Sequence, residues 1–368
     1  MRDLAKIAKI QKIEPIADYD KVELATVENY PVIVKKGEFK ADDLCVFIGY
    51  DTLLPLKKEF EFLKKNSYSK LYNMYRIRNM KMCGVYSSGI IFPLSVLPEG
   101  TKVKEDLDVT DLLGVKKYDP EEAKELINPN QKQVKHCALY YVLAKYKWFR
   151  KLFLKRGYSV SYPESVKKSD ETNIEKAFNN LKNNHLVAKY YKTEKMEGQA
   201  GTWLLIGKKR RYCVYSHNTA RTPKGNGNWE KVGREYDLEK ILRSEKRNYA
   251  IQGEVCGPNI QGNIYGFSRL FLFVYKVTDV ETGEALNFHE LYDFCNRHCL
   301  TMVPILASDV DLPDTVDEVL KDCEGYSMFG TNVLREGIVW RSMTSQDVGC
   351  KAKSRAYQVW FNGNKETE

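Results

Sequence analysis

The sequence lacks the features that mark several classes of protein. Its 368 residues contain no apolar run long enough to cross a bilayer, and residues 1–6 lack the apolar core of a signal peptide. The nine cysteines show no paired spacing, which is typical of thiols in a reducing compartment. There is no internal repeat and no low-complexity tract. These absences predict an intracellular protein, cytoplasmic or nuclear and not secreted, with no membrane partner.

The sequence has an excess of positive charge. It contains 58 Lys and Arg residues against 49 Asp and Glu residues, which gives a formal net charge of +9. Each Lys or Arg that binds a phosphate releases counterions, so the excess favours a polyanionic partner, although a membrane surface would attract the same charge. Hydrophobic residues make up 43% of the chain, which is enough for buried cores, and the length indicates two domains.

The first part of the chain has the pattern of a small β domain. Short apolar segments alternate with turn residues, at 22–27, 31–34, 44–48, 72–77 and 85–92. Short strands at this spacing are typical of a small barrel or sandwich. A turn at 98–100 and an acidic segment follow, so we place the first domain at 1–115.

Residues 116–160 differ in composition. Lys, Arg, Tyr, Trp and Phe are frequent from Lys132 to Arg156, and helix breakers are few. We predict a basic, aromatic-rich linker helix. Its aromatic side chains have two compatible interpretations, because they can pack on a neighbouring element or stack on nucleic-acid bases while the basic side chains bind phosphates.

Residues 161–368 mix the patterns of strands and helices, and we predict a second domain of the α+β class. Strands are expected at 186–191, 201–206, 212–215, 250–255 and 270–277. Helices are expected at 171–183, 238–248, 287–299 and 315–324.

Five short clusters of chemically useful residues follow one another in this second domain. The first is Glu194-Lys195-Met196-Glu197-Gly198, a pattern that is weak by itself and equally typical of a surface turn. The others are Gln252-Gly253-Glu254, the aromatic strand 270–275, Arg335-Glu336-Gly337 and Lys351-Ala352-Lys353. Strand spacing places Lys351 and Lys353 on one face. The ordered set is more specific than any one of its members.

The set suits nucleotidyl transfer. Lys195 is the candidate nucleophile for the α-phosphate of ATP, and Lys351 and Lys353 are the cations that would lower its pKa and bind the phosphate. Glu254 and Glu336 supply hard oxygen ligands for Mg²⁺ or for ribose hydroxyls. In the aromatic strand 270–275, Phe273 offers a ring for adenine stacking. Taken singly, each has a plainer interpretation, since a lone Phe is usually core and a lone Glu is usually solvated surface.

These segments resemble the ATP-dependent, nick-sealing RNA ligases in which an OB domain precedes a nucleotidyltransferase domain. Residues 195–198 match the adenylation motif of that family, 252–263 match its next motif, and 336–339 and 351–353 match the last two. Upstream, 162–172 resemble the segment that precedes the nucleophile in RNA ligases. Residues 15–39 resemble the family's OB domain. The resemblance covers nearly the whole chain.

The resemblance implies an α+β protein with an OB-type β-barrel at 1–115 and a covalent nucleotidyltransferase (ATP-grasp-like ligase) domain at 161–368, built of antiparallel sheets flanked by helices. It implies Lys195 as the AMP acceptor and ATP with Mg²⁺ or Mn²⁺ as cofactors. The nucleotide-binding residues would be Glu194, Glu197, His217, Arg221, Glu254, Phe273, Lys351 and Lys353, and the metal ligands would be Glu254 and Glu336. The substrate would be a 3′-hydroxyl RNA end and a 5′-phosphate end at a nick in duplex RNA or an RNA–DNA hybrid, bound by a monomer.

The sequence departs from the family pattern at three places. Glu197 stands where the superfamily usually has Asp, so the reach of this carboxylate differs by one methylene. His217 stands in a Ser-His-Asn triplet where the family commonly has Ser-Arg-Asn, and Arg221 is expected to compensate. Asn173 stands where an arginine is expected. These changes affect the contacts to the ribose and the nucleic-acid end more than the adenylation chemistry.

Three other functions fit parts of the sequence. A GTP-using capping enzyme shares the lysine chemistry, and a DNA ligase does too, but both would carry a further module after the transferase domain, and few residues follow Lys353. A non-catalytic RNA- or tRNA-binding protein would combine the OB domain with a decayed transferase. The intact Lys195, Glu254, Glu336 and Lys351 argue against decay.

Overall fold

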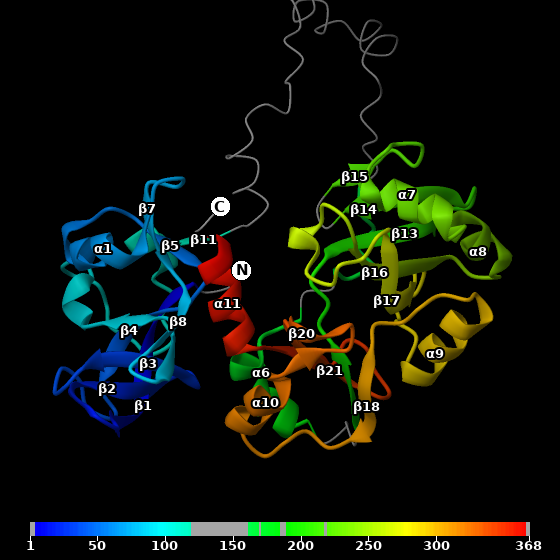
Figure 1. The fold of residues 1–368 in the computed structure, drawn as a ribbon. Coiled ribbons are helices and arrows are strands. Elements are labelled where there is room, and N and C mark those ends of the chain that lie inside the picture. Colours follow the sequence, from blue (N-terminus) through cyan, green and yellow to red (C-terminus); the bar gives the residue numbers. More distant parts are fainter. Residues whose placement is uncertain (1–3, 119–160, 169–170, 185–188, 217–218, 366–368) are drawn as a thin grey trace, which may run out of the picture. The chain divides into compact units, whose positions relative to one another are not determined.

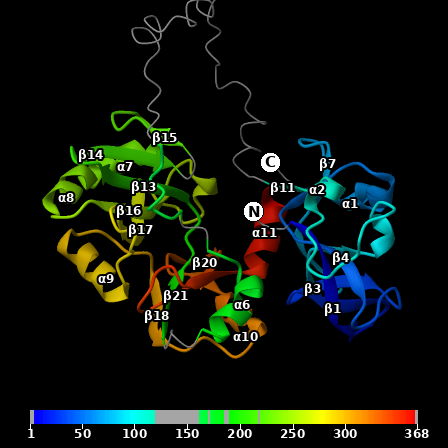
Figure 2. The same cartoon turned by 180° about the vertical axis from the view of Figure 1, so that it is seen from behind.

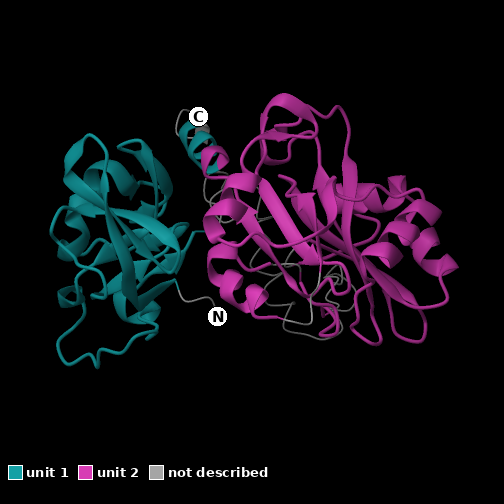
Figure 3. Ribbon diagram, turned by 90° about the horizontal axis from the view of Figure 1, so that it is seen from below, with its two compact units in different colours: residues 1–135, 358–368 teal, residues 136–357 magenta. Residues whose placement is uncertain are grey.

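The computed structural model describes residues 4–118, 161–168, 171–184, 189–216 and 219–365. They form two compact units, coloured separately in Figure 3, which comprise 1–135 with 358–368 and 136–357. The predicted linker helix lies outside the described residues from 119 onward. No helix among the described residues has the length and apolar character needed to cross a membrane.

The amino-terminal unit is built almost entirely from short strands. Its strands are β1 (Ala5–Ile16), β2 (Tyr19–Val27), β3 (Tyr30–Lys35), β4 (Leu44–Ile48), β5 (Thr52–Leu54), β6 (Tyr68–Ser69), β7 (Met74–Ile77), β8 (Asn79–Met82), β9 (Val85–Ser88), β10 (Ile90–Phe92) and β11 (Lys116–Lys117). Short helical turns are η1 (Lys58–Leu63), α1 (Lys64–Ser67), η2 (Leu94–Val96) and α2 (Thr110–Leu113). The main sheet has the order β10-β4-β1-β2-β3, and a second has the order β11-β5-β7-β6 (Figure 1).

The long strand β1 organises this unit because both of its faces are buried. Ile7 is fully buried on one face, in a cluster with Val46 of β4. Ala8 and Ile10 are fully buried on the other face, with Val27 of β2. A register shift after Ile10 lets β1 pair with β4 along its first half and β2 along its second. A bulged strand of this kind bends a sheet toward closure.

The second unit contains two antiparallel sheets. The first has the order β18-β12-β21-β22 and the second β15-β14-β13-β16-β17. Their strands are β12 (Tyr190–Glu194), β13 (Gln199–Ile206), β14 (Arg211–Ser216), β15 (Ala220–Arg221), β16 (Tyr249–Cys256), β17 (Phe271–Asp279), β18 (Ile305–Val310), β21 (Gly337–Ser342) and β22 (Gly349–Lys353). A separate hairpin joins β19 (Tyr326–Ser327) to β20 (Gly330–Leu334).

Helices flank both sheets. They are α6 (Ile174–Lys182), α7 (Asn228–Glu235), α8 (Leu238–Ser244), α9 (Phe288–Arg297) and α10 (Val316–Cys323), with the short turn η3 (Gln261–Asn263). A last helix, α11 (Arg355–Lys365), begins in this unit, and its residues from 358 onward belong to the amino-terminal unit. Figures 1 and 2 show α6 and α10 together beside the first sheet, where they pack on β22. Side-chain capping fixes the starts of α9 and α10, at Asn287 with Glu290 and at Thr315 with Glu318. The predicted α+β class is confirmed.

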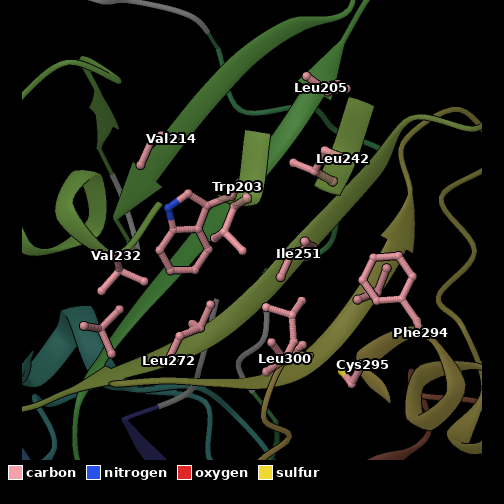
Figure 4. Packing of buried hydrophobic residues seen from close by; sticks show 14 of the residues in the cluster. Trp203, Leu205, Val214, Val232, Leu242, Ile251, Leu272, Phe294, Cys295 and Leu300 are labelled. Atoms are coloured by element: carbon pink, nitrogen blue, oxygen red, sulfur yellow. The ribbon is translucent and has the colours of Figure 1, made fainter. Parts of the chain in front are cut away.

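The second sheet carries the largest apolar core of this unit. Trp203 of β13 is fully buried, and its indole Nε1–H donates to the carbonyl of Trp229 at 2.9 Å. Val232 of α7, Leu242 of α8 and Ile251 of β16 surround it (Figure 4). Helices α7 and α8 therefore cover one face of this sheet and leave the other face for the site.

Candidate active site

Lys195 lies at the point where β12 ends and the chain turns toward the second sheet. Its backbone N–H donates to the carbonyl of Gly337 at 2.9 Å, which fixes the loop against β21. Its Nζ lies 2.5 Å from Oε1 of Glu336, and the lysine side chain is 24% exposed. The structure thus brings together two residues, 141 positions apart, that the sequence predicts to share a site.

The first sheet forms the floor of a cavity of about 210 Å³ beside Lys195. Thr193 of β12, Val339 of β21 and Lys351 of β22 are direct partners across three strands, and all three line the cavity. Arg341 lies two residues beyond Val339 on the same face and lines the cavity too. Along the floor, the order from the nucleophile is therefore Lys195, Thr193 with Val339, then Arg341.

The second sheet supplies the opposite wall. Ala200 of β13 pairs with Glu254 of β16, and both side chains line the cavity, as does Tyr275 of β17. Phe273 pairs with Glu254, but it is only 3% exposed and its ring packs on Phe329 at a centroid distance of 5.2 Å. Its adenine-stacking role stays a prediction. Tyr275, which the sequence analysis did not single out, presents an aromatic ring to the cavity.

Two motif glycines allow the close approach of the chains that carry the acids. A Cβ on Gly198 would lie 2.6 Å from the carbonyl oxygen of Val255 and 2.8 Å from Cγ of Glu254. A Cβ on Gly337 would lie at 2.1 Å from the carbonyl oxygen of Ala352. Real Cβ atoms do not approach so closely, so a side chain at either position would push the Lys195 loop or β21 away from its neighbour.

The charge state of Lys195 is set by opposing effects. Burial lowers its pKa and so does the nearby Lys353, but the carboxylates of Glu336 and Glu197 outweigh them, and the pKa lies above its ordinary value. In this state the lysine is protonated and a poor nucleophile. A cation held by Glu336 would weaken this ion pair and favour the neutral, nucleophilic amine.

Glu254 and Glu336 fit a divalent cation. Burial, together with the carboxylates of Glu336, Glu197 and Glu171, raises the pKa of Glu254 to about 8 against the opposing effect of Lys195. Glu336 is 8% exposed, and its Oε2 has no hydrogen-bond partner. No group of three His, Cys, Asp or Glu residues in the described part of the chain is arranged to hold a metal ion. Two carboxylates that complete their coordination with substrate phosphates are a common arrangement for Mg²⁺.

The two lysines of β22 lie on one face, as the sequence predicts. Residues 349, 351 and 353 are partly exposed, whereas Cys350 and Ala352 are buried. Lys351 lines the cavity, and Lys353 is close enough to Lys195 to lower its pKa. Both cations are therefore positioned beside the nucleophile, where phosphate charge would lie.

The acids that flank Lys195 hold the loop in place. Glu194 is 1% exposed, its Oε2 accepts from the backbone N–H of Met328 at 2.8 Å, and burial raises its pKa. Glu197 accepts from the hydroxyl of Tyr357 at 2.9 Å, and its own N–H donates to the hydroxyl of Tyr265 at 2.7 Å. Glu194 lines the cavity, whereas these contacts of Glu197 are structural. Their predicted nucleotide contacts stay predictions.

Two predicted residues, His217 and Arg221, remain. His217 lies outside the described residues. Arg221 of β15 places its guanidinium 4.5 Å from the ring centroid of Trp229, and it is not among the residues that line the cavity. Whether Arg221 compensates at the ribose is therefore untested, and that role stays a prediction.

An ion pair that the sequence analysis missed lies at the inner end of the cavity. Arg341 is 2% exposed, and its Nη2 lies 2.5 Å from Oε1 of Glu171. Its Nε and Nη1 form no hydrogen bond, although the guanidinium lies 5.7 Å from the ring centroid of Tyr275, and the buried hydroxyl of Thr193 forms none either. Buried polar groups without partners are rare, and here they line a cavity, which indicates a polar ligand. The alternation of β21 from Gly337 through Val339 to Arg341 is the signal that could have found this residue.

Comparisons with known proteins give one consistent result. Residues 4–94 match a family model of an OB-fold domain, and residues 188–357 match the RNA ligase family model. Three solved structures of the Naegleria gruberi RNA ligase share the fold, each at 22% identity. They are a mutant with AMP and Mn (TM-score 0.80, 99% of this chain and 100% of that chain), a mutant with ATP and Mn (0.81, 99% and 99%) and the ligase with PPi (0.80, 100% and 100%). No curated protein matches the chain.

Proposed function

We propose that this chain, in which residues 4–94 match an OB-fold domain model and residues 188–357 match the RNA ligase family model, uses ATP and Mg²⁺ or Mn²⁺ to join a 3′-hydroxyl RNA end to a 5′-phosphate end at nicks in duplex nucleic acid. The observation that carries the proposal is the ion pair between Lys195 and Glu336 at the mouth of a cavity lined by two sheets. We propose that it acts as an intracellular monomer.

In the first step, the Nζ of Lys195 attacks the α-phosphorus of ATP, a P–N bond forms, and pyrophosphate leaves. Lys351 and Lys353 bind the phosphate oxygens as negative charge builds in the transition state. Glu254 and Glu336 would hold the divalent cation, which supplies electrostatic stabilisation of the transferred phosphate. The AMP then passes to the 5′-phosphate, and the 3′-hydroxyl attacks that phosphate with release of AMP.

The cavity fits adenosine in one direction. With the α-phosphate at Lys195, the base extends along the floor past Thr193 and Val339 toward Arg341. Successive residues of a strand rise about 3.3 Å, which puts Arg341 roughly 13 Å along β21 from the Gly337 carbonyl that holds the lysine loop. The unpartnered donors of Arg341 would meet ring nitrogens at the far edge of the base, and Tyr275 would contact the base from the opposite wall.

Replacing Arg341 is expected to weaken ATP binding more than it slows transfer. Arg341→Met should raise the KM for ATP by at least about tenfold, because hydrogen bonds from a charged donor contribute about 1.5–3 kcal/mol. The measurement is the initial rate of AMP incorporation as a function of ATP concentration. The double variant Glu171→Gln/Arg341→Met controls for the charge that the single variant leaves buried on Glu171. An unchanged KM in both variants would place the base elsewhere.

The proposed function is tested with labelled nucleotides and defined nucleic-acid ends. The protein is incubated with α-labelled ATP or GTP and Mg²⁺ or Mn²⁺, and label on the chain is measured. We expect label from ATP, followed by sealing of a nicked duplex in preference to free single-stranded ends. Label from GTP alone would support a capping enzyme, and no label from either nucleotide would support an RNA-binding protein. Substituting DNA on the 5′-phosphate side of the nick tests the tolerance for hybrids.

A further inference from the structure

The hairpin formed by β19 and β20 exposes apolar side chains at its tip. Tyr326 is 57% exposed, Met328 is 63% exposed and Phe329 is 37% exposed. Three large hydrophobic residues within four positions form a patch, which we call the hairpin tip. Contiguous exposed apolar side chains on a surface of this kind mark an interaction site.

The hairpin tip is tied to the nucleophile loop at two points. The backbone N–H of Met328 donates to the carboxylate of Glu194, the residue before Lys195. The ring of Phe329 packs on Tyr265 at a centroid distance of 5.7 Å, and the hydroxyl of Tyr265 accepts from the N–H of Glu197. The residue before Lys195 therefore binds the tip directly, and Glu197, two residues after Lys195, binds it through Tyr265. The tip therefore lies next to the loop that carries Lys195.

The charge of the hairpin fits a nucleic-acid partner. Residues 325–335 contain no Asp or Glu, and the flanking glutamates are engaged elsewhere, Glu324 with Ser354 and the N–H of Arg355 and Glu336 with Lys195. Arg335 is the basic residue of this segment, and its guanidinium donates to the carbonyl of Tyr326 at 3.2 and 3.1 Å. A second guanidinium, that of Arg269, lies 4.8 Å from the ring centroid of Phe271, which belongs to the same group of aromatic rings as Phe329. Aromatic rings edged by arginines are a common platform for stacked bases.

We propose that the hairpin tip stacks on a base of the nucleic acid at the nick and so sets the reacting end beside Lys195. This inference rests on the proposed function, because it names the part of the substrate that the tip contacts. Tyr326 and Met328 would make the contact, since their side chains are the most exposed of the three. Phe329 would support them from below through its ring contacts.

The test measures binding separately from chemistry. The variant is Tyr326→Ala/Met328→Ala, which retains the backbone N–H that binds Glu194. The control is Tyr292→Ala, which removes an equally exposed aromatic (47%) from α9. Fluorescence anisotropy gives the Kd for a nicked duplex, either intact or with an abasic nucleotide on one side of the nick. Label from ATP is measured on each protein in parallel.

We expect the double variant to bind the intact nick about tenfold more weakly, because stacking on one base contributes about 1–3 kcal/mol. When one base at the nick is removed, the affinity of the wild-type protein and of the Tyr292→Ala control should fall by a similar factor. The affinity of the double variant should not change. The inference is overturned if the abasic nucleotide weakens binding by the double variant as much as binding by the wild-type protein, or if the double variant binds the intact nick with unchanged affinity. Either result would favour a protein partner for the tip. A parallel loss of ATP label overturns it too, since the tip would then act on Lys195. Failure of the proposed function would appear instead as wild-type protein that takes no label.

Discussion

Lys195→Ala is expected to take no label from α-labelled ATP, a loss of at least about 10⁴-fold in adenylation, because the nucleophile itself is removed. Lys195→Arg should fail equally. A guanidinium keeps the positive charge beside Glu336 but is not deprotonated in proteins, so this variant separates the charge from the nucleophilicity. The measurement is label on the chain after denaturing electrophoresis.

Lys189→Ala is the matched control for the lysine variants. Lys189 lies just before β12, is 41% exposed and pairs with Asp311 on the surface, so its loss should leave the label unchanged. Both Lys195 variants should still act on a nick whose 5′ end already carries AMP, since that substrate bypasses the lysine. Label on Lys195→Ala would mean that another residue accepts AMP.

The residues that meet at the site could be predicted from the sequence because each motif is short and local, whereas the chemistry assigned to them stays a prediction. Lys195, Glu254, Glu336, Lys351 and Lys353 are fixed by the residue types that nucleotidyl transfer needs, and the structure gathers them around one loop and two sheets. The strands could be predicted for the same reason, since alternation of apolar residues is visible within a few positions.

The inner end of the cavity could not be predicted in this way. Arg341 reaches it because β21 pairs with β12 in a particular register, and Glu171 reaches it from a segment before α6. The sequence analysis names Phe273 as the stacking ring, and Tyr275 lies two residues further along the same strand, β17. Phe329 of the hairpin packs on Phe273 and buries it, whereas Tyr275 lines the cavity. The contact joins residues far apart in the sequence, so local patterns do not predict it.

Helix α11 was missed for a different reason. Its sequence, 355–365, is short and contains Gly363 and two Asn residues, which lower the helical signal. The helix begins just after β22, where Glu324 binds both the Ser354 hydroxyl and the Arg355 N–H. Ser354 in turn accepts from the N–H of Tyr357. Because the first turn of α11 is stabilised by Glu324, which is distant in the sequence, residues 355–365 alone do not indicate where the helix begins.

Glu336→Gln is expected to slow adenylation by about 10²- to 10³-fold, comparable to the loss of one strong electrostatic contact in a transition state. The direction of this change distinguishes two roles. Glu336 raises the pKa of Lys195, so a neutral glutamine lowers that pKa and leaves more of the lysine deprotonated at neutral pH. If Glu336 only held the lysine, the variant would therefore be faster.

A slower variant means that Glu336 binds the cation. It also means that the loss of this binding slows transfer more than the larger fraction of deprotonated Lys195 accelerates it. The adenylation rate should be measured against pH and Mg²⁺ concentration. In the wild-type protein it should rise with pH, because the pKa of Lys195 is raised, and in Glu336→Gln the rise should occur at lower pH while the need for Mg²⁺ increases. Glu239→Gln, an exposed partner of Arg243 on α8, should match the wild type in both respects. A Glu336→Gln variant that transfers AMP faster than the wild type at neutral pH would show that the carboxylate restrains the lysine and takes no part in the transfer.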